Sequence, residues 1–353
     1  MNTTTNSTVK KFVLPANFSY DDPLPFECDT STNLTSSLVA YAFQASYLIL
    51  GAVLNALIIR TIFRTKQSVY RTNSFYLLYT ADAIVGIYIN LSELLIGRLF
   101  IFITPLCPIV SPYIFTPSIF FKAYYAAVHY SSGFKTVSQI FLTFNRMTCV
   151  VMPLQHLRLW RKALKPVLVV LFILPLGVIW NILISRVYIN PNGGGFSVNY
   201  KDRIPWANVS LLHLIYCVVC FVSVIIFFVI TIFGLVMLER RVKSTERSLT
   251  LATMVMSVQM LIFAFIQIYF AFFAASTPSI RSLLLLLVVV IYDSMNVASP
   301  VALILMSRQL RKDIFNLPDD NTTVAPSRSI STVSQHNQSF RNISTVVSPT
   351  VPL

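Results

Sequence analysis

Apolar residues are gathered into seven long runs that are separated by short polar segments. The runs cover residues 37–63, 74–97, 118–148, 166–186, 209–238, 249–275 and 282–307. Each is long enough for the about 20 residues that a helix needs to cross about 30 Å of hydrocarbon. Helices are expected because lipid offers no water to satisfy the backbone, and because the runs do not alternate like barrel strands. The pattern therefore predicts an all-α membrane protein built as a seven-transmembrane helix bundle.

The segments outside these runs are polar. Residues 1–36 contain no short apolar core before a small-residue cleavage site, so we expect no cleavable signal peptide there. Residues 308–316 place apolar and basic side chains on different sides of a short helix, which is typical of a helix lying on a membrane surface. Residues 317–353 are rich in Ser and Thr and are predicted to be a disordered tail.

The positive charges predict the orientation of the bundle. The chain carries a net charge of +14, but only 11% of its residues are charged, against about 25% in a soluble domain. With the N-terminus outside, the inner segments hold 18 of the 27 Lys and Arg residues, the outer segments hold 8, and Lys135 lies within a span. Arg98 is counted here with the outer loop. The positive-inside rule then places the N-terminus outside and the C-terminus in the cytoplasm. Because the charge reports topology, it gives no support to nucleic-acid binding.

The predicted outer segments carry candidate modification sites. N-glycosylation sequons begin at Asn2, Asn6, Asn17, Asn33 and Asn208. Cys28 and Cys107 are the two cysteines on the oxidising side, where the alternatives are a disulfide between them and two free thiols.

Ionisable residues inside the spans are the main functional candidates, because they are costly in hydrocarbon. Asp82 and Lys135 lie at similar depths, roughly 14 Å and 16 Å from the inner face at about 1.5 Å per residue, so a buried pair is geometrically permitted. A predicted intramembrane polar network contains Asn55, Asp82, Lys135, Asp293, Asn296 and Pro300. The alternative for each of these residues alone is a structural contact between helices.

A further candidate is the stretch "QIFLTFNRMTCVVMP", in which Asn145 and Arg146 end the third span. Arg146 is either an anchor at the inner edge of the membrane or part of a signalling switch. Catalytic motifs of the H-E-x-x-H, G-x-S-x-G and P-loop types do not occur, and the four His residues are scattered. We therefore predict no enzyme activity, no cofactor and no metal site.

Several ordered blocks resemble the nematode serpentine chemoreceptors of class gamma (Srg), which are similar to G-protein-coupled receptors. They are "RTNSFYLLYTADAI", "TPLCPIVSPYIFTPS", "QIFLTFNRMTCVVMP", "WNILISRVYINPNGGGFSVNY", "ERSLTL" and "DSMNVASPVALILMSRQLR". The resemblance covers about Ser37 to Phe315. It implies a chemosensory receptor in the plasma membrane of sensory neurons, which detects a small external molecule and signals through a heterotrimeric G protein. The alternative is a multi-span transporter or a ligand-gated channel subunit.

Overall fold

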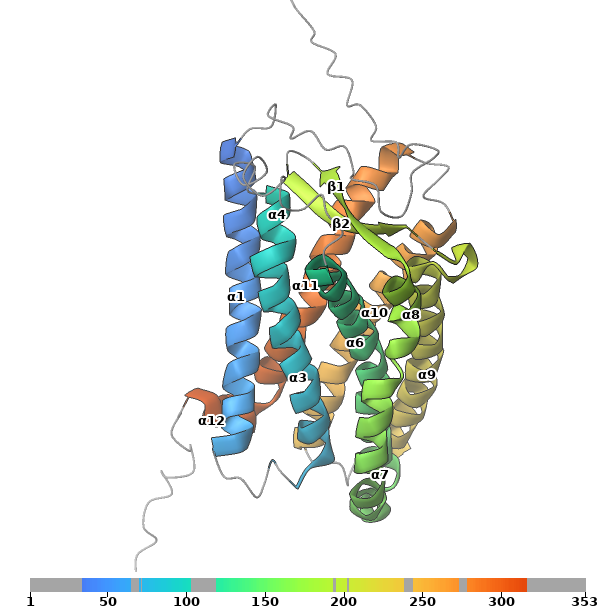
Figure 1. The fold of residues 1–353 in the computed structure, drawn as a ribbon. Coiled ribbons are helices and arrows are strands. Elements are labelled where there is room, and N and C mark those ends of the chain that lie inside the picture. Colours follow the sequence, from blue (N-terminus) through green and yellow to red (C-terminus); the bar gives the residue numbers. More distant parts are fainter. Residues whose placement is uncertain are drawn as a thin grey trace, which may run out of the picture. The chain divides into compact units, whose positions relative to one another are not determined.

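The protein is a bundle of long helices with a β-hairpin at one end (Figure 1). The computed structural model describes residues 34–64, 70, 72–102, 119–192, 195–201, 203–237, 244–272 and 278–315. All of them belong to one compact unit that ends at Leu317. The predicted disulfide, the four sequons before the first span and the Ser/Thr-rich tail lie outside the described residues.

The helices follow the apolar runs and extend beyond several of them. In chain order they are α1 (Leu34–Arg64), α3 (Ser74–Ser92), the π-helical turn η1 (Glu93–Arg98), α4 (Leu99–Phe102), α6 (Ile119–Val151), α7 (Pro153–Ile173), α8 (Leu176–Ile184), the 3-10 turn η2 (Pro205–Ala207), α9 (Val209–Met237), α10 (Ser244–Phe272), α11 (Pro278–Met306) and α12 (Arg308–Phe315). Two strands, β1 (Arg186–Asn192) and β2 (Gly195–Lys201), pair antiparallel with Arg186 opposite Lys201.

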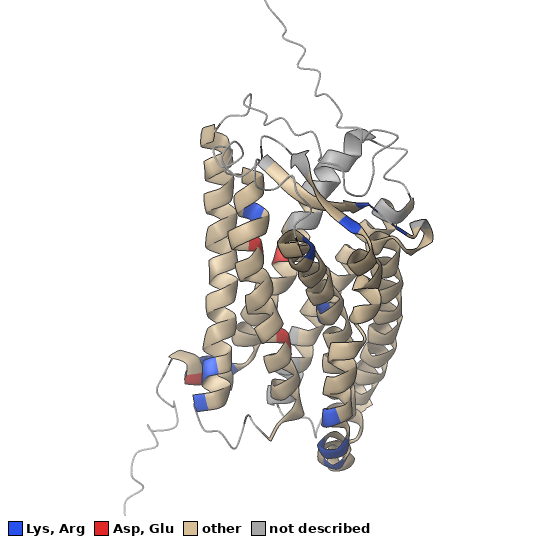
Figure 2. Cartoon of the chain, viewed as in Figure 1, with Lys and Arg blue, Asp and Glu red and all other residues tan. Residues whose placement is uncertain are grey.

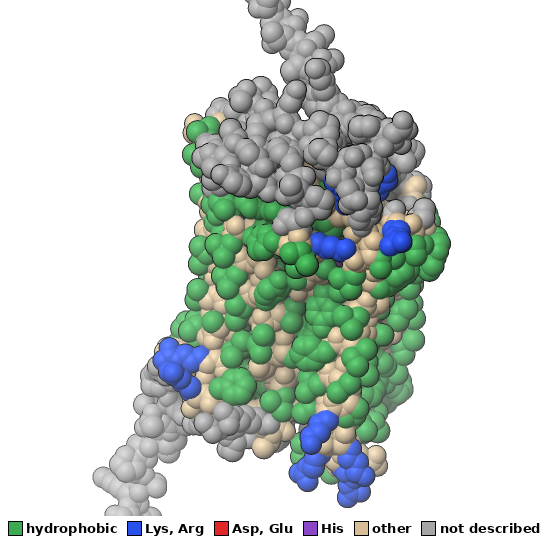
Figure 3. Space-filling view, viewed as in Figure 1, with side chains coloured by type: hydrophobic (Ala, Val, Ile, Leu, Met, Phe, Trp, Pro, Cys, Tyr) green, Lys and Arg blue, Asp and Glu red, His purple; other side chains and the backbone are tan. Residues whose placement is uncertain are grey.

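The outer surface of the bundle is apolar, as a membrane protein requires. In the described part of the chain, four helical segments are long and apolar enough to cross a membrane, namely Leu34–Arg64, Ser74–Phe102, Pro153–Ile184 and Val209–Met237. A fifth is added if Val290–Met306 and the bent helix after it form one span. Large apolar side chains such as Phe43, Ile84 and Phe265 are exposed, and hydrophobic side chains are spread over the middle of the described face, between the basic residues at its two ends (Figure 3). The protein is therefore a multi-pass membrane protein.

Helix α6 forms the centre of the bundle, since it packs against α3, α7, α8, α9 and α10. Every residue from Ser131 to Gln139 is buried, although six of these nine residues are polar. In a lipid environment a polar face must be satisfied by other helices. Gln139 illustrates this, because its Nε2 donates to the Ser257 hydroxyl of α10 at 3.1 Å. Buried polarity is thus concentrated where the helices meet.

Three features differ from the sequence-based predictions. Arg98 does not lie in an outer loop but in the helical segment that continues α3, where it is buried. The basic segment before the fourth apolar run is helical from Pro153, because proline at the first helical position starts α7 without losing a hydrogen bond. The all-α prediction is also incomplete, because β1 and β2 form a two-stranded antiparallel sheet.

Charged residues are distributed unevenly along the bundle. Figure 2 shows the acidic residues mainly within the helices, whereas most basic residues lie at the end that holds α12 and the start of α7. Helix α12 follows α11 after a bend of 99°. It buries Leu310 and exposes Arg308, and Asp313 accepts a hydrogen bond from the buried Tyr70 hydroxyl. Burial, together with this bond, raises the pKa of Tyr70, so the hydroxyl keeps its proton.

Candidate functional site

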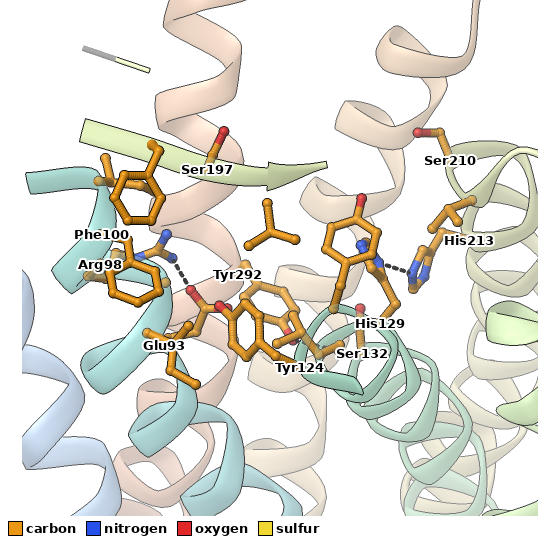
Figure 4. Close-up of a pocket in the computed structure, with 18 of the residues that line it drawn as sticks. Glu93, Arg98, Phe100, Tyr124, His129, Ser132, Ser197, Ser210, His213 and Tyr292 are labelled. Carbon is orange, nitrogen blue, oxygen red and sulfur yellow. Dashed lines mark hydrogen bonds and ion pairs between the residues drawn. The ribbon is translucent and has the colours of Figure 1, made fainter. Parts of the chain in front are cut away.

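A cavity of about 390 Å³ lies inside the bundle, near the end that carries the β-hairpin (Figure 4). This volume falls within the range of about 300–1,000 Å³ that is typical of small-molecule sites. The lining side chains come from η1, α4, α6, β2, α9, α10 and α11. Those that carry polar or aromatic chemistry are Glu93, Arg98, Phe100, Tyr124, Tyr125, His129, Ser132, Phe196, Ser197, Ser210, His213, Phe263, Gln267 and Tyr292.

The π-helical turn η1 determines the chemistry at one end of the cavity. In an α-helix, neighbours on one face are three or four residues apart. A π-turn instead joins residues five apart through its hydrogen bonds, and Glu93 and Arg98 have this spacing. Their side chains therefore lie on one face, with Arg98 Nη2 3.3 Å from Glu93 Oε2.

Arg98 also connects this turn to α11. Its Nη2 donates to Oδ1 of Asp293 at 3.0 Å, so two carboxylates contact one guanidinium. Tyr124 of α6 donates its hydroxyl to Glu93 Oε1 at 3.3 Å. Glu93, Arg98 and Asp293 are each at most 6% exposed. We refer to Glu93, Arg98 and Asp293 as the ion cluster; with Tyr124 it joins three separate helical segments.

A pair of histidines marks the opposite end of the cavity (Figure 4). His129 Nδ1 of α6 and His213 Nε2 of α9 lie 3.1 Å apart. One of the two nitrogens must donate and the other accept, so at least one ring carries its proton on the facing nitrogen. Tyr125 packs against the His129 ring at a centroid distance of 4.4 Å.

The hairpin closes one side of the cavity with an aromatic contact. Phe196 of β2 is 1% exposed, and its ring lies 4.6 Å from that of Phe100 and in the same cluster as Phe121. Ser197 and Val198 of the same strand also line the cavity. A ligand in this space is thereby separated from solvent on the side covered by β2.

The predicted polar network divides into separate contacts. Lys135 Nζ lies 2.8 Å from Asp82 Oδ2, and the Ser138 hydroxyl donates to the other oxygen of Asp82. Asp293, in contrast, belongs to the ion cluster and pairs with Arg98. Sequence reasoning placed these residues in one network, whereas the structure separates them into a central pair and a cluster beside the cavity.

The remaining predicted network residues join α1 to α11. Asn55 donates to the carbonyl oxygen of Asn296 at 3.4 Å and to that of Gly51 at 2.9 Å. Pro300 is buried within α11. These contacts support helix packing and lie outside the cavity lining.

At the other end of the bundle, Asn145 and Arg146 are fully enclosed. Arg146 is 2% exposed; its guanidinium lies 4.1 Å from the centroid of the Phe75 ring, and its Nη2 donates to Asn145 Oδ1 at 3.0 Å. Asn145 in turn donates to the Ser74 hydroxyl at 2.6 Å. Arg146 is therefore held against α3 and not against the cavity.

Asn208 is the one predicted sequon among the described residues. Its side-chain oxygen accepts a hydrogen bond from the Leu211 amide at the start of α9.

Glu93, Arg98 and His213 are the site residues that sequence reasoning missed. The five-residue spacing of Glu93 and Arg98 does not suggest contact in an α-helix, and the two histidines are 84 residues apart. One signal in the sequence was the presence of Glu93 and Arg98 at the end of an apolar run. Charged residues in such a place are costly unless they pair with each other.

Gly97 leaves room for the ion cluster, and this makes a testable prediction. A Cβ at this position would overlap Glu93 Oε2 and would lie 2.6 Å from the Tyr124 hydroxyl. We expect Gly97→Ala to displace the Glu93 carboxylate and to raise the half-maximal concentration of any compound that activates the wild type by about tenfold, or 1.4 kcal/mol.

The measurement is a concentration–response curve in cells, corrected for the amount of the protein at the cell surface. Gly234→Ala is the matched control, because its added methyl contacts Val150 far from the cavity. Unchanged sensitivity in Gly97→Ala would show that the position of Glu93 does not matter for binding.

The fold and the cavity define a class of protein, a helical multi-pass membrane protein with an internal cavity near one end. Comparison with known proteins identifies the family. The model of the Srg family of chemoreceptors matches residues 41–314, which is most of the chain, so the chain belongs to this family.

Named relatives from Caenorhabditis elegans agree with this assignment. The chain is 65% identical to serpentine receptor class gamma-10 over 315 residues, covering 89% of this chain and 97% of the relative. It is 54% identical to serpentine receptor class gamma-20 over 88% of this chain and 90% of the relative. It is 48% identical to serpentine receptor class gamma-13 over 92% of this chain and 96% of the relative. The protein is accordingly a membrane chemoreceptor and not an enzyme.

Proposed function

We propose that the protein detects a small external molecule in the cavity between η1, α6, α9, α10 and α11. The observation that carries this proposal is the cavity itself, since it is of ligand size, is lined by six Phe and Tyr side chains and has Glu93 and Arg98 of the ion cluster in its wall. A ligand there touches several helices at once. It can therefore favour one arrangement of the bundle over another through differential affinity.

The proposed topology has seven spans, with residues 1–36 outside the cell and residues 317–353 in the cytoplasm. The basic residues gathered at the end with α12 support this orientation by the positive-inside rule. In this arrangement the cavity opens toward the outside, and α12 lies on the inner membrane surface. Asn145 and Arg146 then lie, buried, near the end of the bundle at which a heterotrimeric G protein binds, and the receptor acts in the plasma membrane of sensory neurons.

Calcium imaging of cells that express the receptor tests the ligand site. We expect compounds from an odorant and pheromone panel to evoke a response that Ser132→Phe abolishes, because the added ring fills the cavity. Leu95→Phe is the matched control, since Leu95 of η1 is 61% exposed on the surface of the bundle and does not line the cavity. Blocking G-protein signalling should also remove the response; a ligand-evoked current that persists under this block would instead indicate a channel.

A further inference from the structure

We propose that the cavity binds organic amines, and that the ammonium group of the ligand lies against Glu93. This inference rests on the proposed ligand-binding function and adds the chemical class of the ligand. Three observations lead to it: the charge of the ion cluster, the placement of its carboxylates and the aromatic character of the walls.

The ion cluster contains two acidic groups but one basic group. Glu93 and Asp293 both contact the Nη2 atom of Arg98, at 3.3 Å and 3.0 Å. One guanidinium cannot neutralise two ionised carboxylates, so one negative charge is left in excess. A buried charge without a partner is costly. Among the described residues, Arg98 is the cation that contacts these two carboxylates, so a ligand ammonium can supply the second positive charge.

Glu93 is the carboxylate that a ligand can reach. It lines the cavity together with Arg98 and Tyr124, whereas Asp293 is not among the described lining residues. Its contact with Arg98 is also the longer of the two. Among the described residues that line the cavity, Arg98 is the only one with a permanent positive charge, and it is already engaged by both carboxylates. A new cation near Glu93 therefore meets an acceptor that is only partly satisfied.

The aromatic walls of the cavity also favour a positively charged ligand. Six aromatic side chains line the cavity, namely Phe100, Tyr124, Tyr125, Phe196, Phe263 and Tyr292. The faces of aromatic rings attract cations, and groups of such rings recognise ammonium ligands. A ligand carboxylate would instead place a third carboxylate beside one guanidinium and would face the negative ring surfaces. The site thus selects amines over acids of the same shape.

Binding to the purified full-length receptor in lipid nanodiscs tests this selection. Matched amines, alcohols and carboxylic acids with phenethyl, hexyl and cyclohexylmethyl skeletons are compared at pH 7 by isothermal calorimetry. We expect the best-binding amine to bind at least about tenfold more tightly than its alcohol and its acid, since it adds a charge-assisted hydrogen bond. Glu93→Gln, which keeps the size and removes the charge, should abolish this preference, and Glu93→Asp should retain it.

The outcomes separate this inference from the proposed function. If alcohols or acids bind as well as their amines, or if Glu93→Gln keeps the amine preference, the amine class is overturned and the ligand cavity stands. If no amine of the panel binds, the amine class is also overturned. The ligand cavity is then tested separately, by whether Ser132→Phe abolishes the response to activating compounds.

Discussion

Replacement of Lys135 by methionine should destabilise the receptor by about 3–5 kcal/mol, because it leaves a buried carboxylate without its ionic partner. Asp82 is 4% exposed, and the ammonium of Lys135 lies 2.8 Å from its Oδ2. In Lys135→Met, the Ser138 hydroxyl still donates to Asp82, but one neutral hydrogen bond does not offset the lost charge. The expected observations are low surface expression and a lower unfolding temperature in detergent.

A double variant distinguishes the buried charge from simple loss of packing. Asp82→Asn combined with Lys135→Met removes both charges, so it should recover much of the stability that Lys135→Met loses. Lys162→Met is the control, since Lys162 is exposed on α7 and a surface substitution changes stability by about 0.5 kcal/mol at most. If the double variant is no more stable than Lys135→Met, the pair is not the reason for the loss.

The helices of this receptor could be predicted from the sequence because burial in lipid gives a strong and local signal. An apolar run of about 20 residues has few alternatives to a helix. The run at 209–238 and α9 (Val209–Met237) nearly coincide. The helical start of α7 at Pro153 escaped prediction, because its basic side chains are solvated on one face and therefore resemble a loop.

The cavity could not be predicted to the same degree, because its contacts join residues that are distant in the chain or unusually spaced. Asp82 and Lys135 were recognisable, since a single charge deep in a span requires a partner. Arg98 appeared to be a loop residue because it lies at the end of an apolar run. Only the π-turn brings it beside Glu93, and only the packing of α11 brings it to Asp293.

Replacement of Arg146 by alanine should abolish ligand-evoked signalling while the receptor still reaches the cell surface. In the structure, Arg146 is held inside the bundle by Phe75 and Asn145, and Asn145 is held in turn by Ser74. These contacts hold the guanidinium inside the bundle. If activation releases Arg146 toward the proposed G protein, its removal eliminates the active contact, while Asn145 keeps its hydrogen bond to Ser74.

Phe75→Leu should have the opposite effect to Arg146→Ala and should raise signalling instead of abolishing it. It removes the ring that holds the guanidinium at 4.1 Å, and a desolvated cation–π contact contributes about 2 kcal/mol. The equilibrium should therefore shift toward the released state, with ligand-free signalling raised about thirtyfold. Both variants are compared with wild type in a second-messenger assay, normalised to surface receptor detected through an N-terminal epitope on intact cells. Loss of surface delivery in Arg146→Ala, together with unchanged ligand-free signalling in Phe75→Leu, would leave Arg146 as a structural anchor and not a switch.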